Sequence, residues 1–104
     1  MDMLLAEKAN DFIKDNALKY GEMVANRENI DEGLKVTEAK LMNEIKGAEH
    51  IKKAYARSHE DYQLLLDGRK AARAEELRLK IMLQAAQNQF EMWRSWNSAN
   101  KKGA

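Results

Sequence analysis

The stretch that decides the fold spans residues 58–96 and reads SHEDYQLLLDGRKAARAEELRLKIMLQAAQNQFEMWRSW. It contains no proline, and Ser58 with Asp61 three residues later is typical of a capped helix start. Its apolar residues fall on two helical stripes. The first comprises Tyr62, Leu65, Ala72, Leu79, Leu83, Ala86, Phe90 and Trp93, and the second Leu66, Ala74, Leu77, Ile81, Ala85, Met92 and Trp96. One stripe suffices for a two-helix pair, so the second predicts a further covering by another copy.

A second long helix is expected before this one, over residues 3–46. Its apolar residues recur at spacings of three and four: Ala9, Ile13, Tyr20, Met23, Ile30, Leu34, Leu41 and Ile45. The same register places Asn16, Arg27 and Thr37 at positions that normally hold apolar residues, which weakens a simple coiled-coil interpretation. Gly47 predicts the helix end, because glycine readily adopts the left-handed conformation found after a last turn.

Three glycines lie inside the expected helices. Gly21, Gly33 and Gly68 each cost about 1 kcal/mol relative to alanine, and indicate bending, close packing or local weakness. The run from Asn29 to Gly33 leaves open whether the first helix is broken there.

These patterns predict an all-α fold within one domain, residues 1–104. We expect a long antiparallel helical hairpin made of a helix over 3–46, a short helix or turn over 48–57, a helix over 59–97 and a frayed tail over 98–104. Two such hairpins are expected to form a homodimer, as a four-helix bundle or a coiled-coil-like assembly.

Composition narrows the function classes. The chain has 104 residues, a net charge of +1 and no cysteine, so disulfides and thiolate chemistry are excluded. No apolar run approaches the roughly 18 residues that span a bilayer, and no signal-peptide core is present. We expect a cytoplasmic protein that does not contact membranes.

Catalytic and metal-binding motifs are not found. His50 and His59 are the only histidines, and their spacing matches no zinc motif. The neighbouring acids Asp31-Glu32 and Glu75-Glu76 point about 100° apart on a helix and cannot share a proton. The sequence therefore predicts no enzyme, no cofactor, no metal and no small-molecule substrate.

The charges are unevenly distributed. Residues 1–34 hold eight acids and four bases, whereas residues 35–58 hold six bases and three acids. An antiparallel pair would place the acidic start beside the second half of the last helix. A basic cluster near the turn is a candidate nucleic-acid contact, comprising Lys52, Lys53, Arg57, Arg69, Arg73 and Lys80. Pairing of these bases with acids of the first helix, such as Glu38 and Glu44, is the favoured alternative.

The C-terminal aromatic cluster is the candidate partner or dimer interface. It comprises Phe90, Met92, Trp93, Arg94 and Trp96. Aromatic side chains can stack bases, but spacings of three keep them near one helix side, where burial in an interface is the usual role.

The C-terminal half resembles small, largely uncharacterised helical proteins of tailed bacteriophages. The resemblance covers residues 54–100 and rests on Tyr62-x-x-Leu65-Leu66-x-Gly68, Ala71, Glu75-Glu76-Leu77-Arg78, Leu83-x-Ala85-Ala86-Gln87 and Glu91-x-Trp93-Arg94-Ser95. It implies a phage origin, in the host cytoplasm, and a link to early DNA-metabolism genes.

Two functions follow as hypotheses. The first is a non-enzymatic accessory protein that self-associates and binds a protein partner, as a host-modulating or DNA-metabolism factor. The alternative is a DNA- or RNA-binding accessory of recombination or replication, which uses the basic cluster on phosphates.

Overall fold

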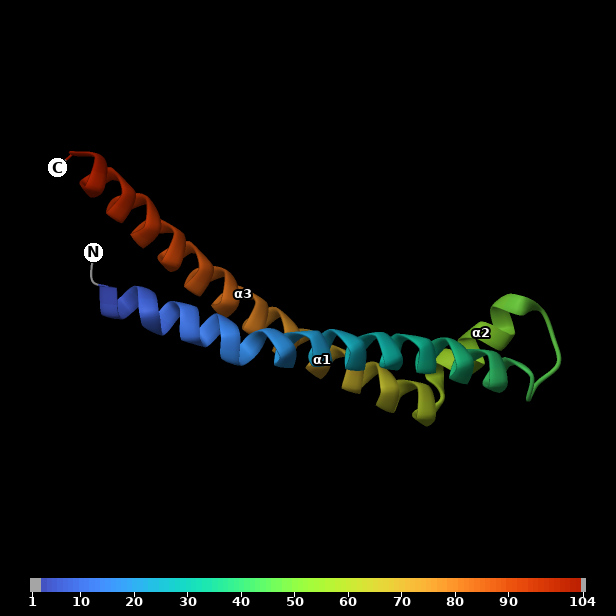
Figure 1. The fold of residues 1–104 in the computed structure, drawn as a ribbon. Coiled ribbons are helices and arrows are strands. Elements are labelled where there is room, and N and C mark those ends of the chain that lie inside the picture. The colour runs from blue at the N-terminus through green and yellow to red at the C-terminus, as the bar shows by residue number, and fades with distance from the viewer. Residues whose placement is uncertain (1–2, 104) are drawn as a thin grey trace. The chain divides into compact units, whose positions relative to one another are not determined.

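The computed structural model describes residues 3–103, with side chains up to residue 100. Three helices follow one another in this range: α1 (Met3–Met42), α2 (Glu49–Ser58) and α3 (Glu60–Gly103) (Figure 1). Among the described residues there is no strand, so the all-α prediction is confirmed for this part of the chain. Helix α1 runs without interruption through Asn29–Gly33, which answers the question that the sequence left open.

Helix α1 has one continuous buried or half-buried seam with alternating spacings of three and four. Its members are Ala6, Ala9, Ile13, Asn16, Tyr20, Met23, Arg27, Ile30, Leu34, Thr37 and Leu41. The polar residues lie half-buried on this seam and do not interrupt it. Asn16 Nδ2 donates to the Phe12 carbonyl at 2.8 Å, and Arg27 Nη1 lies 3.1 Å from Asp31 Oδ2. These partners explain how a heptad seam tolerates polar groups at such positions.

Helix α3 presents a matching inner seam. It consists of Tyr62, Leu65, Arg69, Ala72, Glu76, Leu79, Leu83, Ala86, Phe90, Trp93 and Asn97, all buried or half-buried. This is the first of the two stripes predicted from the sequence, with polar residues added at three positions. The spacing is that of a left-handed coiled coil.

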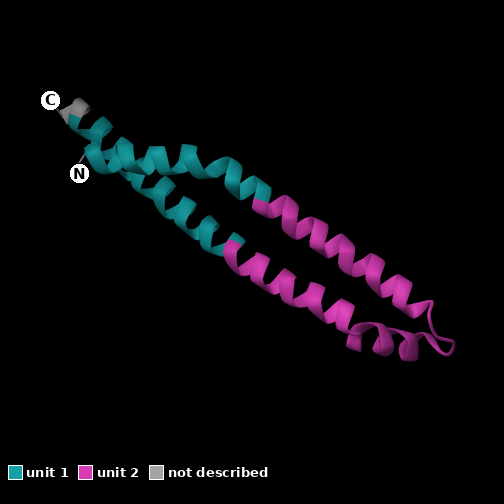
Figure 2. Ribbon diagram, turned by 90° about the horizontal axis from the view of Figure 1, so that it is seen from below, with its two compact units in different colours: residues 1–22, 76–104 teal, residues 23–75 magenta. Residues whose placement is uncertain are grey.

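The chain divides into two compact units, which Figure 2 shows in different colours. Unit 1 joins residues 1–22 with residues 76–104, and unit 2 comprises residues 23–75. Unit 1 therefore pairs the acidic start of the chain with the second half of α3, as the antiparallel prediction requires. The expectation of a single domain stays a prediction.

Unit 2 holds the connection between the two long helices. Asp31, Glu38 and Glu44 of the first segment contact Arg69, Arg57 and Tyr55 respectively. Because the partners occur in reverse order along the chain, the two sides of unit 2 run antiparallel. Leu34, Leu41 and Ala56 are its buried apolar residues.

Helix α1 ends four residues earlier than the predicted end at residue 46. After Met42 the backbone tightens into a turn in which Glu44 N–H donates to the Leu41 carbonyl at 3.1 Å. Gly47 has a φ of +140°, so glycine is needed here, although it follows a turn and not the last helical residue. The turn brings Glu44 within reach of Tyr55 on the short helix.

The start of α3 also differs from the prediction, because Ser58 is not its cap. Helix α2 continues through Ser58, whose hydroxyl donates to the Tyr55 carbonyl at 3.0 Å. The break falls at His59, which is extended, and α3 begins at Glu60. His59 Nδ1 accepts a hydrogen bond from Asp61 N–H at 3.1 Å and so caps the new helix in place of the serine.

The frayed tail expected over residues 98–104 is not found in the described backbone. Helix α3 continues to Gly103, and Asn97 extends its seam beyond the aromatic cluster. No proline or earlier glycine stops the helix after Trp96. Residue 104 lies outside the described residues.

The glycines inside the helices do not mark close contacts. A Cβ placed at Gly21, Gly33 or Gly68 would meet nothing within 4 Å, so the expectation of close packing at these positions was wrong. Each glycine instead lowers the stability of its helix, because glycine favours the helical conformation less than alanine does.

We therefore expect opposite effects of the same substitution at two glycines. Gly33→Ala should raise the free energy of unfolding by about 0.5–1 kcal/mol, because alanine favours the helix and has free space there. Gly47→Ala should lower it by about 1 kcal/mol, because the strain arises from the positive φ and not from a clash: Ile51 Cγ2 is 3.9 Å away. Urea unfolding followed by circular dichroism measures both, and a destabilised Gly33→Ala protein would contradict this explanation.

Candidate interaction surfaces

The second α3 stripe forms an exposed apolar surface within unit 1. We call it the outer stripe and define it as Leu77, Ile81, Ala85, Asn88, Met92 and Trp96, all of which are exposed. The large apolar members expose 56% (Leu77), 58% (Ile81), 64% (Met92) and 48% (Trp96) of their surface. At 100° per residue the stripe is centred about 160° from the inner seam, so it lies on the opposite face of the helix.

The surroundings of the outer stripe are unusual for a solvent-exposed helix. Residues 81–90 contain no charged side chain on any face of α3. An exposed helix face normally carries acids and bases that keep it hydrated. This uncharged window is the sequence signal that would have added Ile81 to the predicted interface.

The structure separates the predicted aromatic interface into two faces. Phe90 and Trp93 are half-buried on the inner seam, with ring centroids 6.2 Å apart and an interplanar angle of 32°. Met92 and Trp96 lie on the outer stripe. Only these two of the predicted apolar anchors are available to a partner without opening the contact between α1 and α3.

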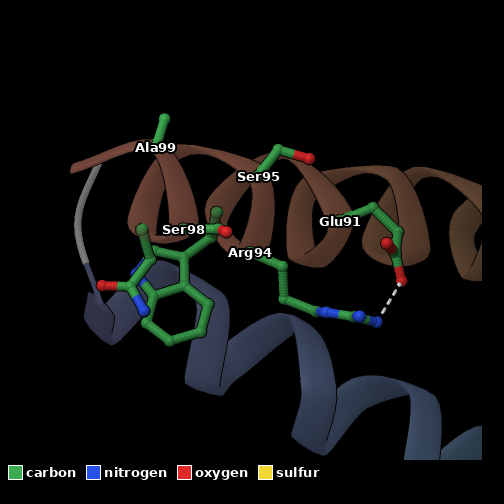
Figure 3. A pocket seen from close by; sticks show the side chains of 7 residues that line it. Glu91, Arg94, Ser95, Ser98 and Ala99 are labelled. Atoms are coloured by element: carbon green, nitrogen blue, oxygen red, sulfur yellow. Dashed lines mark hydrogen bonds and ion pairs between the residues drawn. The ribbon is translucent and has the colours of Figure 1, made fainter. Parts of the chain in front are cut away.

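Arg94 does not belong to the outer stripe, because at 100° per residue it points about 160° away from Met92, on the side of α3 that faces α1 (Figure 3). Its Nη1 is 3.2 Å from Glu91 Oε1, one turn earlier on the same helix. Figure 3 shows this pair, with Ser95 and Ala99 pointing away from the α1 ribbon. An open hollow of about 860 Å³ is lined here by residues of α3 alone: Glu91, Trp93, Arg94, Ser95, Asn97, Ser98 and Ala99. A single helix cannot surround a ligand, so the hollow is surface relief and does not enclose a substrate.

A second open hollow, of about 570 Å³, lies along one edge of the outer stripe. It is lined by Asn88, Glu91, Met92 and Ser95. These residues are spaced i, i+3, i+4 and i+7, the arrangement of four side chains that receives one side chain of a facing helix in knobs-into-holes packing. The outer stripe therefore has the relief of a helix-packing surface as well as its composition.

Three of the six residues in the basic cluster predicted for nucleic acid form ion pairs with acids. Arg57 Nε is 3.1 Å from Glu38 Oε2, Arg69 Nε is 2.9 Å from Asp31 Oδ1, and Lys53 Nζ is 3.6 Å from Glu49 Oε1. The favoured alternative was pairing of the basic residues with acids of the first helix such as Glu38 and Glu44; Arg57 and Arg69 do pair with acids of α1, whereas Glu44 accepts a hydrogen bond from Tyr55. Of the remaining residues, Lys52 is half-buried, and Arg73 and Lys80 are exposed. Phosphate binding by the whole cluster would require these ion pairs to open.

Asp31 lies between two arginines in unit 2. One carboxylate oxygen lies 3.1 Å from Arg27 Nη1 and the other 2.9 Å from Arg69 Nε. Asp31 Oδ1 and Arg69 Nε are both shielded from solvent, and their geometry does not meet hydrogen-bond criteria. The two atoms therefore form a close charge contact whose hydrogen-bond angle is unfavourable. Neither atom has another hydrogen-bond partner among the described residues, so each is left unpaired if the other is removed.

Tyr55 attaches α2 to the end of α1. Its hydroxyl donates to Glu44 Oε2 at 2.8 Å. This hydrogen bond raises the pKa of Tyr55 above its ordinary value of 10.0, and partial burial and the negative charge of Glu44 raise it further. The neutral phenol is thus favoured by folding.

This shift predicts a loss of stability at alkaline pH. The folded state holds the Tyr55 proton more tightly than the unfolded state, so the contribution is complete below pH 10 and is lost as the pH rises through the higher folded pKa. The free energy of unfolding should fall less steeply above pH 10 in Tyr55→Phe than in the original protein. Denaturant titrations between pH 8 and pH 11 measure this, with Glu44→Gln as the control that keeps an acceptor but removes its charge. Equal slopes in all three proteins would contradict the assignment.

The two histidines form no metal site in the described part of the chain. His50 is exposed. His59 accepts the hydrogen bond from Asp61 N–H at the helix junction, and its ring packs edge-on with the ring of Tyr55, with the ring centroids 6.0 Å apart. Residues 3–103 include no group of three or more histidine, cysteine, aspartate or glutamate side chains placed to hold a metal. Within the same range, no helix combines the length and apolarity needed to cross a bilayer.

Comparison of the chain with protein families, with curated proteins and with solved structures finds no match.

Proposed function

We propose that this protein is a non-enzymatic helical accessory protein that self-associates through the outer stripe of α3. The observation that supports this most directly is the exposure of Leu77, Ile81, Met92 and Trp96 along one helix face, whose central stretch, residues 81–90, carries no charge. A continuous apolar surface of this kind on a soluble helix marks a site that another protein surface covers.

Burial of the outer stripe supplies the driving force for association. Burial of the exposed half of one large apolar side chain contributes about 1 kcal/mol, so eight such side chains in a dimer give roughly 8 kcal/mol. The loss of rotational and side-chain freedom on association opposes this gain, so the buried area alone does not give a dissociation constant, and we expect a weak dimer. The test therefore uses a high concentration, about 100 μM protein.

The test is the solution mass of the chain and of a variant with a disrupted stripe. At about 100 μM, sedimentation velocity should give twice the chain mass of 12.0 kDa for the original protein and the single mass for the variant Ile81→Glu/Met92→Glu. A carboxylate buried in an apolar interface is strongly unfavourable, whereas on an exposed helix face it is tolerated.

Leu64→Glu is the matched control. Leu64 is also a large apolar residue of α3, with 63% of its surface exposed, but it lies in unit 2. It should leave the dimer intact. Circular dichroism checks that both variants remain helical. A single chain mass for the original protein at this concentration would refute the proposed self-association.

Binding of a further protein partner is the second part of the proposal. The resemblance of residues 54–100 to small phage proteins motivates it, since accessory and host-modulating proteins of that kind act through protein contacts. Met92 and Trp96 are the predicted interface residues that lie on the outer stripe, whereas Arg94 is exposed on another side of α3.

Nucleic-acid binding is the alternative function, and fewer observations favour it. The ion pairs of Lys53, Arg57 and Arg69 reduce the positive charge that phosphates would meet, which leaves Arg73 and Lys80 as the exposed members of the predicted cluster. Retention of DNA in a low-salt filter assay, with a steep loss on adding salt, would favour this alternative over the proposal above.

A further inference from the structure

The residues of the outer stripe are spaced symmetrically about its centre. From Leu77 to Trp96 the successive intervals are four, four, three, four and four residues. If a second α3 lies antiparallel across the stripe, Leu77 falls level with Trp96 of the other copy, Ile81 with Met92, and Ala85 with Asn88. A two-fold interface requires this property, because the same surface must match itself after rotation.

The side chains near the centre are small and those near the ends are large. Ala85 and Asn88 occupy the middle of the stripe, and the exposed Leu77 and Trp96 occupy its ends. Small central residues allow two helices to approach closely, and an asparagine in an otherwise apolar helix contact fixes register and orientation.

The period of the stripe allows contact over its whole length. Its residues repeat every eleven positions, as in Leu77 and Asn88, Ile81 and Met92, and Ala85 and Trp96. Eleven residues make three turns of about 3.67 residues, close to the 3.6 of a straight helix, whereas the inner seam follows a repeat of seven. Two nearly straight helices can therefore meet along the outer stripe for roughly 30 Å.

The hollow along the edge of the stripe supplies an independent match. Asn88, Glu91, Met92 and Ser95 surround it, and the residue of an antiparallel second copy that falls level with its centre is Ile81. Ile81 is 58% exposed and is the apolar side chain available to fill that hollow. By symmetry each copy offers one knob and one hole.

The charges beside the stripe favour the same direction. Lys80 and Glu91 are eleven residues apart and so lie on the same side of the helix, and both are exposed. An antiparallel copy brings Lys80 within two residues of the level of Glu91 of the other copy. In a parallel two-fold pair, Lys80 and Glu91 of one copy would lie on the opposite side of the interface from those of the other copy, so this attraction would be lost.

Resting on the proposed self-association, we propose that a second copy of this chain packs antiparallel on the outer stripe, with a two-fold axis between Ala85 and Asn88 and with Ile81 of each copy inserted into the hole formed by Asn88, Glu91, Met92 and Ser95 of the other.

Single-cysteine cross-linking tests this geometry, because the chain contains no cysteine of its own. Ala85→Cys lies near the axis, where the two copies of the residue are only about 5 Å apart along the helices, and should cross-link to itself with a short bismaleimide. Ser95→Cys should not, because its two copies are separated by about 26 Å along the axis. A mixture of Ser95→Cys and Arg78→Cys should form the mixed cross-link, because these two positions fall level.

Leu64→Cys, an exposed position in unit 2, measures the background of random collisions. Each variant is first examined by sedimentation velocity, which separates failure of the geometry from failure of self-association. A dimer in which Ser95→Cys links to itself is parallel and overturns the proposed geometry. A dimer without any cross-link above the Leu64→Cys background uses another surface and also overturns it, while self-association stands. Monomeric variants from a monomeric original protein would refute both.

Discussion

Replacement of Leu34 by alanine should lower the free energy of unfolding by about 3 kcal/mol. Leu34 is one of the few large apolar residues that are almost fully buried, with 5% of its surface exposed, and it lies on the α1 seam in unit 2. The substitution removes three buried carbon atoms and leaves a cavity that two long helices can only partly close. Because the buried apolar residues are mainly alanine and a few leucines, each leucine carries a large share of the stability.

The control is Leu64→Ala in the same unit. Leu64 is 63% exposed, so the same chemical change should alter the free energy of unfolding by less than about 0.5 kcal/mol. Urea unfolding at one fixed protein concentration measures both, since dimerisation makes the stability depend on concentration. Equal losses from the two substitutions would show that Leu34 does not belong to a packed core.

Replacement of Asp31 by alanine should cost about 2 kcal/mol, the second-largest effect we expect. Asp31 lies 2.9 Å from Arg69 Nε, an atom that is shielded from solvent. Loss of the carboxylate leaves that guanidinium nitrogen buried beside no acceptor. The magnitude is lower than for a fully buried pair, because 26% of the Asp31 side chain and 30% of the Arg69 side chain remain exposed.

Glu32→Ala provides the matched control at the next residue. Glu32 also pairs with a base, Lys35 at 3.3 Å, but both side chains are more than two-thirds exposed. Its removal should change the stability by less than about 0.5 kcal/mol. Combined replacement of Asp31 by leucine and Arg69 by methionine should restore part of the loss, because Arg69 Nε is then no longer buried without an acceptor, although Arg27 still loses its contact with Asp31. A double variant as unstable as the sum of Asp31→Leu and Arg69→Met would refute the coupling.

The helical fold could be predicted because it depends on local pattern. The absence of proline, the three-four spacing of apolar residues in the first helix, and the two apolar stripes of the last helix are properties of the sequence that act within a few residues. Helix ends were less predictable. His59 caps α3 with its imidazole, which the usual preference for serine at that position does not anticipate.

The candidate surface could be predicted only in part, for a geometric reason. Periodicity shows that Phe90 and Trp93 share one face and that Met92 and Trp96 share another, but it does not show which face α1 covers. Proximity in sequence therefore grouped four residues that the structure assigns to two surfaces. Likewise, the charge of Arg69 was evident from the sequence, whereas its ion pair with Asp31 was not.

The sequence by itself determined that this chain forms long helices, that the last helix has two apolar faces, and that no catalytic motif is present. Only the tertiary structure decided that the face of Leu77, Ile81, Met92 and Trp96 stays exposed and that Arg57 and Arg69 are paired with acids. The physical reason is the distance along the chain over which each interaction acts. Helix formation and amphipathicity arise from neighbours three and four residues apart, whereas burial and ion pairing depend on the register between segments such as those of Asp31 and Arg69, which are far apart in the chain.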